Sequence, residues 1–433
     1  MAVQVAGIGA PQLRSFARFA PQIMPVPYAQ VVAMIKAGAN GQWAIQSRPG
    51  PTWAPQGYAS LDAAMARVNF NPHGFISGAA TAFQDGGHTW ALPYAVRVVG
   101  VQYRPEAFSA TGIPPPSADW TLEDFETACA GIAACMRRGR LPQYAGVLPA
   151  LGYAAAVETA VWDGLAHGFG GTLAAGGRYT LGNPGALAGF SRVLQLWARY
   201  GTATVSTGDA GAYVAQPTRP QPPGTGSAMA FTLFDGTDAP GAGWRLARFP
   251  VLPRQPVVPV RVLGAFLGYW SNDHGIADFV SLDGIDVPQA ATEAVVELAL
   301  WQRQTQTAAP AQSGFPPAIA DASAQAAYWQ EAGTAHPGAR ALGDWQHYLP
   351  TEQGWPPIDG NPYTVLLAAL KSAASDPPRV AGALQKAENR LNLMVAQYAA
   401  DMRQAVAARR ERASVASSFP TAGPSVASGS TNR

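Results

Sequence analysis

The sequence predicts an α/β fold in two lobes that are joined by crossing strands. Strand-like and helix-like segments alternate near the N-terminus, which is typical of a doubly wound α/β unit. A long strand-like run at 90–103 then leaves this region and leads into a new βα unit, as a chain does when it crosses between lobes. With 433 residues, there is room for two domains or for one large two-lobed unit.

The composition fits a well-packed protein and argues against some partners. Hydrophobic residues make up 48% of the chain and charged residues only 13%, so a large core is expected. The formal net charge of +2 is too small to indicate nucleic-acid binding. The 12 Trp and 14 Tyr residues fit core packing, and they also fit a carbohydrate site, where rings stack on sugar faces.

The first lobe is expected to begin with a β-α-β-α-β-α order. Strands are predicted at 3–9, an apolar run that ends in glycines, at 23–26, a short run broken by Pro25, and at 43–46. Helices are predicted at 12–20, 29–39 and 58–68.

The stretch 86–128 connects this region to the next. Gly86-Gly87 predicts a turn before the strand-like run. A short helix around Glu106–Ala110 is expected to end at Gly112. Thr121 has the position of an N-cap, with Asp124 three residues on, so a second helix is predicted over Leu122–Met136.

The rest of the chain is expected to complete the second lobe and return to the first. The following segments are predicted: a strand at 144–149, helices at 154–166 and 183–200, β-rich passages at 244–252 and 257–269, a helix at 288–302, a third crossing at 314–317, and a long helix at 378–411 whose apolar stripe packs on its lobe. Residues 413–433 are rich in Ser, Ala, Pro and Gly, so a disordered tail is expected.

Motifs of enzymes and metal sites are not found in the sequence. Gly7-Ile8-Gly9 has no third glycine at dinucleotide-binding spacing, and no Walker loop or G-x-S-x-G elbow occurs. The six histidines show no metal-ligand spacing. Glu158 and Asp163 lie in one segment and do not form the facing carboxylate pair of a glycosidase. We therefore expect no enzyme activity, no metal and no cofactor.

The two cysteines, Cys129 and Cys135, fall in one predicted helix at a spacing that is too long for a disulfide. We interpret them as buried thiols. No run of about eighteen apolar residues that would span a membrane occurs in the sequence. The first residues, MAVQVAGIGAPQL, show neither the basic nor the apolar segment of a signal peptide, which leaves three alternatives: a leader already removed, a truncated start, or a chain that is not exported.

The stretch 86–128 resembles the segment "GK-x-Y-ALPY … YN … F … G … PPxTW-xE" of bacterial extracellular solute-binding proteins. These are the carbohydrate-binding receptors of ABC transporters that are similar to maltose-binding protein. The matching residues are Gly86, Gly87, Trp90, Ala91, Leu92, Pro93, Tyr94, Tyr103, Phe108, Gly112, Pro115, Pro116 and Trp120. Gly170-Gly171 with Asn183-Pro184, and Gly226–Met229, resemble two further steps of the family.

This resemblance implies a two-lobed periplasmic-binding-protein-like fold of type II, with each lobe a sheet flanked by helices and a ligand cleft between the lobes. Lobe I is expected to comprise residues 1–98 and 262–312, and lobe II residues 99–261 and 313–412. The implied function is capture of a mono- or oligosaccharide, or a related polyol, and its delivery to the permease subunits of an ABC importer. The resemblance also implies a monomer in the periplasm or outside the cell, with no nucleic-acid partner.

The resemblance further implies which residues contact the ligand. They are Trp53, Tyr94, Arg97, Thr159, Trp162, Phe234, Asp235, Tyr269, Trp270, Trp355 and Tyr363. Arg97 departs from the family, because relatives often have a glutamate there that accepts sugar hydroxyls. An arginine offers only donors, in a fork that suits a carboxylate or phosphate. The ligand could therefore be an acidic sugar or a phosphorylated polyol, and Arg97 could instead form a structural salt bridge.

Two other functions remain open from the sequence. One is a glycan-processing enzyme on a similar scaffold, which would turn over a bound sugar. The other is a degenerate or signalling paralogue of the solute-binding proteins, with a protein partner or no ligand.

Overall fold

The structure is a computed structural model of the chain. It describes residues 2–5, 24–26, 42–49, 58–71, 74–76, 78–85, 87–152, 155–202, 226–236, 243–253, 258–271, 278–279, 287, 289–309, 315–343, 348–350, 355–356, 358, 361–374 and 379–418.

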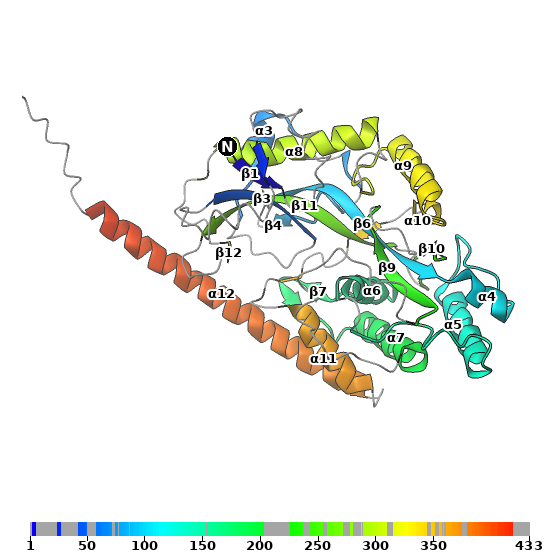
Figure 1. The fold of residues 1–433 in the computed structure, drawn as a ribbon. Helices are drawn as coiled ribbons and strands as arrows, with labels where there is room; N and C mark the ends of the chain where they lie inside the picture. The colour runs from blue at the N-terminus through cyan, green and yellow to red at the C-terminus, as the bar shows by residue number, and fades with distance from the viewer. Residues whose placement is uncertain are drawn as a thin grey trace, which may run out of the picture.

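The described chain alternates between strands and helices, as Figure 1 shows. The strands are β1 (Ala2–Val5), β2 (Met24–Val26), β3 (Gln42–Pro49), β4 (Gln84–Asp85), β5 (His88–Thr89), β6 (Ala91–Tyr103), β7 (Ala174–Ala175), β8 (Arg178–Tyr179), β9 (Met229–Phe234), β10 (Arg245–Arg248), β11 (Val258–Ser271), β12 (Asp278–Phe279) and β13 (Tyr348–Pro350). The helices are α3 (Asp62–Arg67), α4 (Pro105–Thr111), α5 (Leu122–Arg137), α6 (Ala155–Gly168), α7 (Pro184–Tyr200), α8 (Gln289–Ala308), α9 (Ala322–Ala335), α10 (Arg340–Gly343), α11 (Pro362–Ala374) and α12 (Val380–Ser418).

The main sheet has the strand order β10-β6-β11-β3-β1-β2. Strands β2, β1 and β3 are parallel, as the predicted alternation of strands and helices requires. β11 runs antiparallel to both β3 and β6, and β9 and β10 also pair with β6. The long strands β6 and β11 therefore join the N-terminal strands to those of the second half of the chain.

β6 and β11 are buried because apolar, often β-branched residues occupy both of their faces. α8 and α6 both pack against β11, and Figure 1 shows α8 above this strand and α6 below it. α6 lies very close to β11, since a Cβ added to Gly164 would overlap the ring of Pro259. The centre of the molecule is thus a two-sided strand layer between helices.

The helices between β6 and β9 begin where the sequence predicts. α5 starts with a capping box, in which Asp124 N donates to Thr121 Oγ1 at 3.1 Å and Thr121 N donates to the Asp124 carboxylate at 2.8 Å. α7 starts with Asn183 as N-cap and Pro184 in its first turn. α4 ends at Gly112, whose φ of 73° is left-handed and suits glycine.

The C-terminal helices pack against α7 and against each other. α11 packs against both α12 and α7, and α12 also contacts α7 and β8. The predicted apolar stripe of the long helix is buried at Val380, Leu384, Ala387 and Leu391, which confirms that it packs on its lobe. α12 continues to Ser418, past residue 412, after which a tail was expected. Residues 419–433 lie outside the described residues.

Some local predictions are wrong. Residues 144–149 do not form a strand: Gly146 and Leu148 make only isolated bridges, to Ser227 and Gly201. The helix expected at 58–68 is reduced to α3, since its first residues lie beside β11, where Ala59 N donates to Leu267 O at 3.0 Å. The helices expected at 12–20 and 29–39 lie outside the described residues.

Both cysteines lie on α5 and are buried free thiols, as predicted, with 0% of Cys129 and 5% of Cys135 exposed. Burial raises the pKa of the Cys129 thiol well above its ordinary value, with a smaller contribution from Glu126. Among the described residues, no helix is long and apolar enough to cross a membrane.

Candidate ligand-binding site

β6 is the strand on which the candidate site is built. Over its first part it pairs with β11, and from Val98 onward it pairs with β9. Val98 itself lies opposite Val260 of β11 and Phe234 of β9. Three strands therefore lie side by side at this level, where β6 passes from one half of the molecule to the other.

Charged residues of β6, β11 and the end of β9 occupy neighbouring positions next to Val98. Arg97 lies directly opposite Arg261 in the antiparallel pairing of β6 with β11. Asp235 follows Phe234 at the end of β9, and its Oδ2 lies 3.4 Å from Arg97 Nη2. Directly opposite residues project from the same face of a sheet, so the two arginines are neighbours there. We call Arg97, Arg261 and Asp235 the arginine–aspartate trio.

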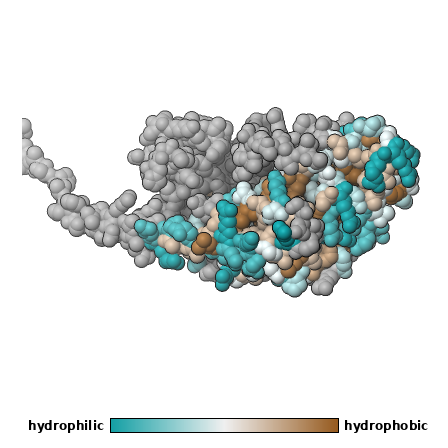
Figure 2. Space-filling view, turned by 90° about the horizontal axis from the view of Figure 1, so that it is seen from below, coloured by the Kyte–Doolittle hydropathy of each residue, from teal (hydrophilic) through white to brown (hydrophobic). Residues whose placement is uncertain are grey.

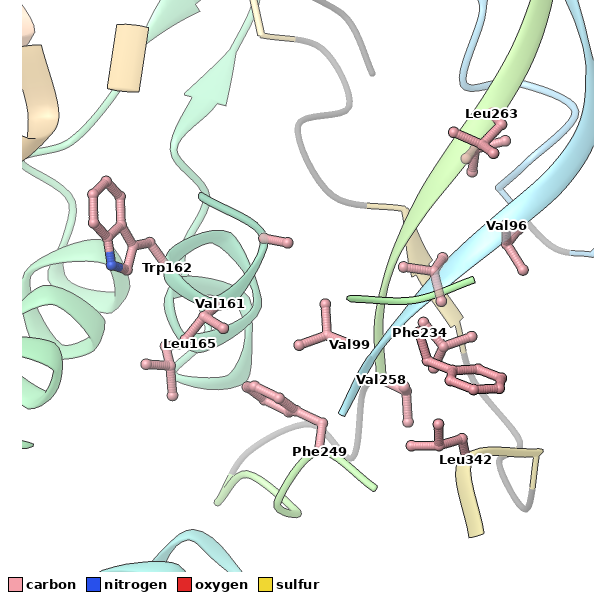
Figure 3. Packing of buried hydrophobic residues seen from close by; sticks show 14 of the residues in the cluster. Val96, Val99, Val161, Trp162, Leu165, Phe234, Phe249, Val258, Leu263 and Leu342 are labelled. Carbon is pink, nitrogen blue, oxygen red and sulfur yellow. The ribbon is translucent and has the colours of Figure 1, made fainter. Parts of the chain in front are cut away.

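The trio lies on the sheet face against which α6 packs. Side chains alternate along a strand, so Arg261 shares a face with Pro259, which contacts α6, and Arg97 shares a face with Val99. Figure 3 shows Val99 on the α6 side of β6 and Val96 on the other side. The trio therefore lies on the face of the sheet that α6 covers.

All three residues of the trio are buried. Arg97 is 8% exposed, Arg261 9% and Asp235 4%. The contact between Arg97 and Asp235 is longer than the roughly 2.7–2.9 Å of a strong charge-assisted hydrogen bond. Arg97 Nε has no hydrogen-bond partner among the described residues. A buried donor without a partner costs about 1–3 kcal/mol, so this atom can bind an acceptor at a gain.

Aromatic residues of α9 pack on the other side of β9. The Phe234 ring lies 5.8 Å from that of Trp329 and 5.4 Å from that of His336. Burial raises the pKa of Tyr328, and the charge of Asp235 raises it further, so this phenol stays neutral. α9 thus holds the end of β9, and with it Asp235, in place.

Two further predicted residues, Trp162 of α6 and Tyr363 of α11, lie in contact with each other. Their rings are stacked, with centroids 5.2 Å apart and planes 10° apart. Tyr363 donates a 2.9 Å hydrogen bond to Glu158 Oε2, and Gly152 N donates one of 2.8 Å to Oε1. Burial raises the pKa of Tyr363, and Glu158 raises it further.

This aromatic stack is part of the packing between α6, α7 and α11. Trp162 is 1% exposed and also contacts Phe190 of α7. In Figure 3 its ring points away from β6 and β11. The structure therefore does not bring Trp162 together with the trio, and in this conformation its face is covered by Tyr363 rather than open to a ligand.

The remaining predicted site residues are placed as follows. Thr159 is buried on α6, and its hydroxyl donates to Ala155 O at 2.9 Å. Trp355 is buried with its ring 5.8 Å from that of Tyr179. The backbone of Tyr94 lies in β6, and those of Tyr269 and Trp270 lie in β11 opposite Trp43 and Gln42. The side chains of these three residues, and all of Trp53, lie outside the part that the structure describes.

Arg261 was missed by the sequence reasoning. The signal that marks it is a single charged residue within the strongly apolar run VVPVRVLGAFLG, at 257–268. A buried charge in such a strand requires a partner or a function. Among the described residues, no cluster of His, Cys, Asp or Glu could hold a metal ion.

A groove of about 410 Å³ lies elsewhere, at the C-terminal ends of α7 and α11. It is lined mainly by apolar side chains such as Leu194 and Trp197, together with Lys371, and none of the predicted site residues lines it. Seen from below in Figure 2, hydrophobic residues of the described chain are interspersed among hydrophilic ones. This groove is separate from the trio on β6, β9 and β11.

The described sheet is mixed and open, and its long strands β6 and β11 pair with strands from both halves of the chain. No family model matches the sequence, and no curated protein matches it. Solved structures do match, at high probability. The cyclic α-maltosyl-1,6-maltose binding protein from Arthrobacter globiformis is 14% identical, with 91% of this chain and 98% of that chain covered and a TM-score of 0.60.

Two other solved structures are similar over the same extent. The ABC substrate-binding protein Lmo0181 from Listeria monocytogenes, in complex with cycloalternan, is 14% identical with a TM-score of 0.59, covering 90% of this chain and 97% of that chain. UgpB from Mycobacterium tuberculosis, in complex with glycerophosphocholine, is 14% identical with a TM-score of 0.58, covering 90% and 94%. The predicted two-lobed, periplasmic-binding-protein-like α/β fold is thereby confirmed. These neighbours are binding proteins rather than enzymes.

Proposed function

We propose that this chain is the solute-binding receptor of an ABC importer and that it captures a carbohydrate or related polyol between its lobes. The observation that carries the proposal is the extent of the fold, which is shared with ligand-binding receptors over about nine tenths of both chains. Neighbours in complex with cycloalternan, maltose and α-D-tagatose support a sugar as the class of ligand.

The arginine–aspartate trio of this protein supports the same proposal. A receptor needs polar groups that are held rigidly and partly desolvated, and that are aimed at the ligand from elements of both lobes. Arg97 and Asp235 meet this description on β6 and β9, where β6 crosses. We propose that they form the polar centre of the site, and that Trp53, Tyr94, Tyr269 and Trp270 contribute aromatic surface to it.

The other predicted site residues are not assigned to the polar centre of the site. Thr159, Trp162, Trp355 and Tyr363 are buried, and Phe234 packs on α9. We propose that these residues support the site from behind or contact the ligand only in another arrangement of the lobes. The lobe limits that the sequence predicts, with 1–98 and 262–312 in one lobe and 99–261 and 313–412 in the other, belong to the same proposal.

The partners and the location follow from the function. A receptor of this kind acts on the outer side of the membrane, in the periplasm or outside the cell, and its closed form docks on the permease subunits of the importer. The chain acts as a monomer, needs no cofactor, and releases its ligand unchanged.

A thermal-shift screen tests the proposal. We expect a neutral oligosaccharide, a sugar acid or a polyol phosphate to raise the melting temperature selectively. A ligand at a hundred times its dissociation constant stabilises by about 2.7 kcal/mol, which corresponds to a shift of several degrees. Product analysis of the same mixtures should recover the ligand intact. A panel of these three classes that leaves the melting temperature unchanged would contradict the proposal, and turnover of the sugar would favour the glycan-processing enzyme.

A further inference from the structure

We infer that the ligand carries an anionic group, a carboxylate or a phosphate, which Arg97 and Arg261 bind together, while Asp235 accepts hydrogen bonds from the ligand's hydroxyl groups. This inference rests on the proposed function and names the chemical class of its ligand.

The first argument is the position of the two guanidinium groups. Arg97 and Arg261 occupy directly opposite positions on adjacent antiparallel strands, so their side chains start only about 5 Å apart on one face of the sheet. Each guanidinium is a planar fork of donors that matches two oxygens of a carboxylate or phosphate. Two such forks side by side form a binding surface for an anion from rigid strands rather than from loops.

The second argument is charge. The trio contains two guanidinium groups and one carboxylate. All three residues are more than nine-tenths buried, and electrostatic interactions are stronger there than in water. An anion placed between the two guanidinium groups would be attracted by both, whereas a neutral sugar would not.

The third argument is that one hydrogen-bond donor of Arg97 is not used by any described residue. Its contact with Asp235 involves Nη2 at 3.4 Å, and its Nε has no partner among the described residues. An oxygen of an anionic group could accept from Nε without displacing Asp235. The Asp235 carboxylate is an acceptor and suits hydroxyl groups. The trio therefore matches a polyhydroxy anion, such as a sugar acid or a polyol phosphate.

Calorimetric titration of the full chain with matched probes tests this inference. The probes are D-glucose, D-glucuronate and glucose 6-phosphate, glycerol and glycerol 3-phosphate, and a neutral maltooligosaccharide. We expect at least one anionic probe to bind ten times or more tightly than its neutral counterpart, and increasing salt to weaken that binding. The carboxylate and phosphate arms distinguish the two kinds of anion.

Variants connect the preference to the trio. Arg97→Gln should lower the affinity for the anionic probe at least tenfold and change the affinity for a neutral probe much less. Asp235→Asn removes a neighbouring negative charge, so the ratio of anionic to neutral affinity should rise. Arg137→Gln, which removes one exposed positive charge at the end of α5, is the matched control and should change neither affinity.

The outcomes separate the inference from the function on which it rests. Binding of the neutral oligosaccharide without any anionic probe would overturn the inference and leave the receptor function standing, with Arg97 as a structural ion pair. Binding of no probe at all would count against both. Should Arg97→Gln fail to fold, Arg97→Lys keeps the charge but loses the fork, and an unchanged anion affinity in that variant and in Asp235→Asn would overturn the inference.

Discussion

Gly171 and Gly185 let two helices approach each other more closely than any other residue type would allow. Gly171 lies just after α6 and Gly185 lies in the first turn of α7. A Cβ added to Gly185 would overlap Gly171 N, and one added to Gly171 would overlap Ala186 N. The resemblance pointed to this "GG … NP" step, and the structure supplies its physical reason.

Gly185→Ala should therefore be strongly destabilising. We expect the free energy of unfolding to fall by about 3 kcal/mol, since neither backbone can move without separating α6 from α7. Gly382→Ala is the matched control. A Cβ there meets nothing within 4 Å on the exposed face of α12, so this substitution should stabilise by about 0.5–1 kcal/mol. Urea unfolding measures both, and equal effects of the two substitutions would contradict this account.

Tyr144 provides a second test at this scale. Burial, followed by its 2.8 Å hydrogen bond to Glu106, raises the pKa of this phenol from 10.0 to about 12. Folding favours the neutral phenol, so its contribution to stability is fully present below pH 10 and is lost as the pH rises through about 12. Absorbance at 295 nm, with Tyr144→Phe as the blank, should show this late titration, and Glu106→Gln should lower its midpoint. Ionisation of Tyr144 near pH 10 in the folded protein would contradict the contact.

At the scale of the element, α6 and α11 are joined by a buried polar contact. Tyr363 donates to Glu158, and its ring stacks on that of Trp162. Tyr363→Phe leaves one oxygen of a buried carboxylate without this donor, so we expect a loss of about 2 kcal/mol in the free energy of unfolding.

Tyr144→Phe is the matched control for Tyr363→Phe. It also removes a tyrosine–glutamate hydrogen bond, but one nearer the surface, and should cost less than about 1 kcal/mol. Thermal unfolding of the ligand-free variants makes the comparison. Equal costs would mean that Tyr363 is not buried in the way the structure describes.

Local sequence signals predicted the helices well where those signals were strong. The Thr121 and Asn183 caps and the three- and four-residue apolar spacing determine α5 and α7, because helix formation depends on nearby residues. Strands depend on partners that are distant in sequence. Residues 144–149 have a strand-like composition, yet they find only single bridges to Ser227 and Gly201.

The difference between local and long-range interactions also explains which features of the candidate site could be predicted from the sequence. Arg97 and Asp235 could be nominated one at a time from the resemblance. Their contact with each other, and the position of Arg261 opposite Arg97, arise from strand register between segments more than a hundred residues apart, which composition and spacing do not reveal. Likewise, nothing local indicates that Trp162 and Tyr363 would face each other rather than a sugar.

At the scale of the whole molecule, the described sheet is continuous through two long strands. β6 and β11 pair with each other along much of their length, and Pro316 and Pro317 lie beside β6, where Val96 N donates to Pro316 O at 3.1 Å. Hinge motion between lobes is therefore expected to bend a few strand positions while each core stays packed.

Ligand binding should close the lobes over the trio. We expect the radius of gyration from small-angle X-ray scattering to decrease when a ligand identified by the thermal screen is added. Arg97→Gln, titrated with an anionic ligand, should require a higher concentration to reach the same compact state. A ligand that stabilises the protein without changing its scattering would contradict closure.

The two buried thiols of α5 have a practical consequence. They are the only cysteines of the chain, and their burial, with the raised pKa of Cys129, makes them slow to react with maleimides. Cysteines introduced at exposed positions such as Gln304 on α8 and Lys386 on α12 would therefore be labelled selectively while Cys129 and Cys135 stay in place. A donor and acceptor dye at these positions would turn the chain into a fluorescent reporter of its own ligand.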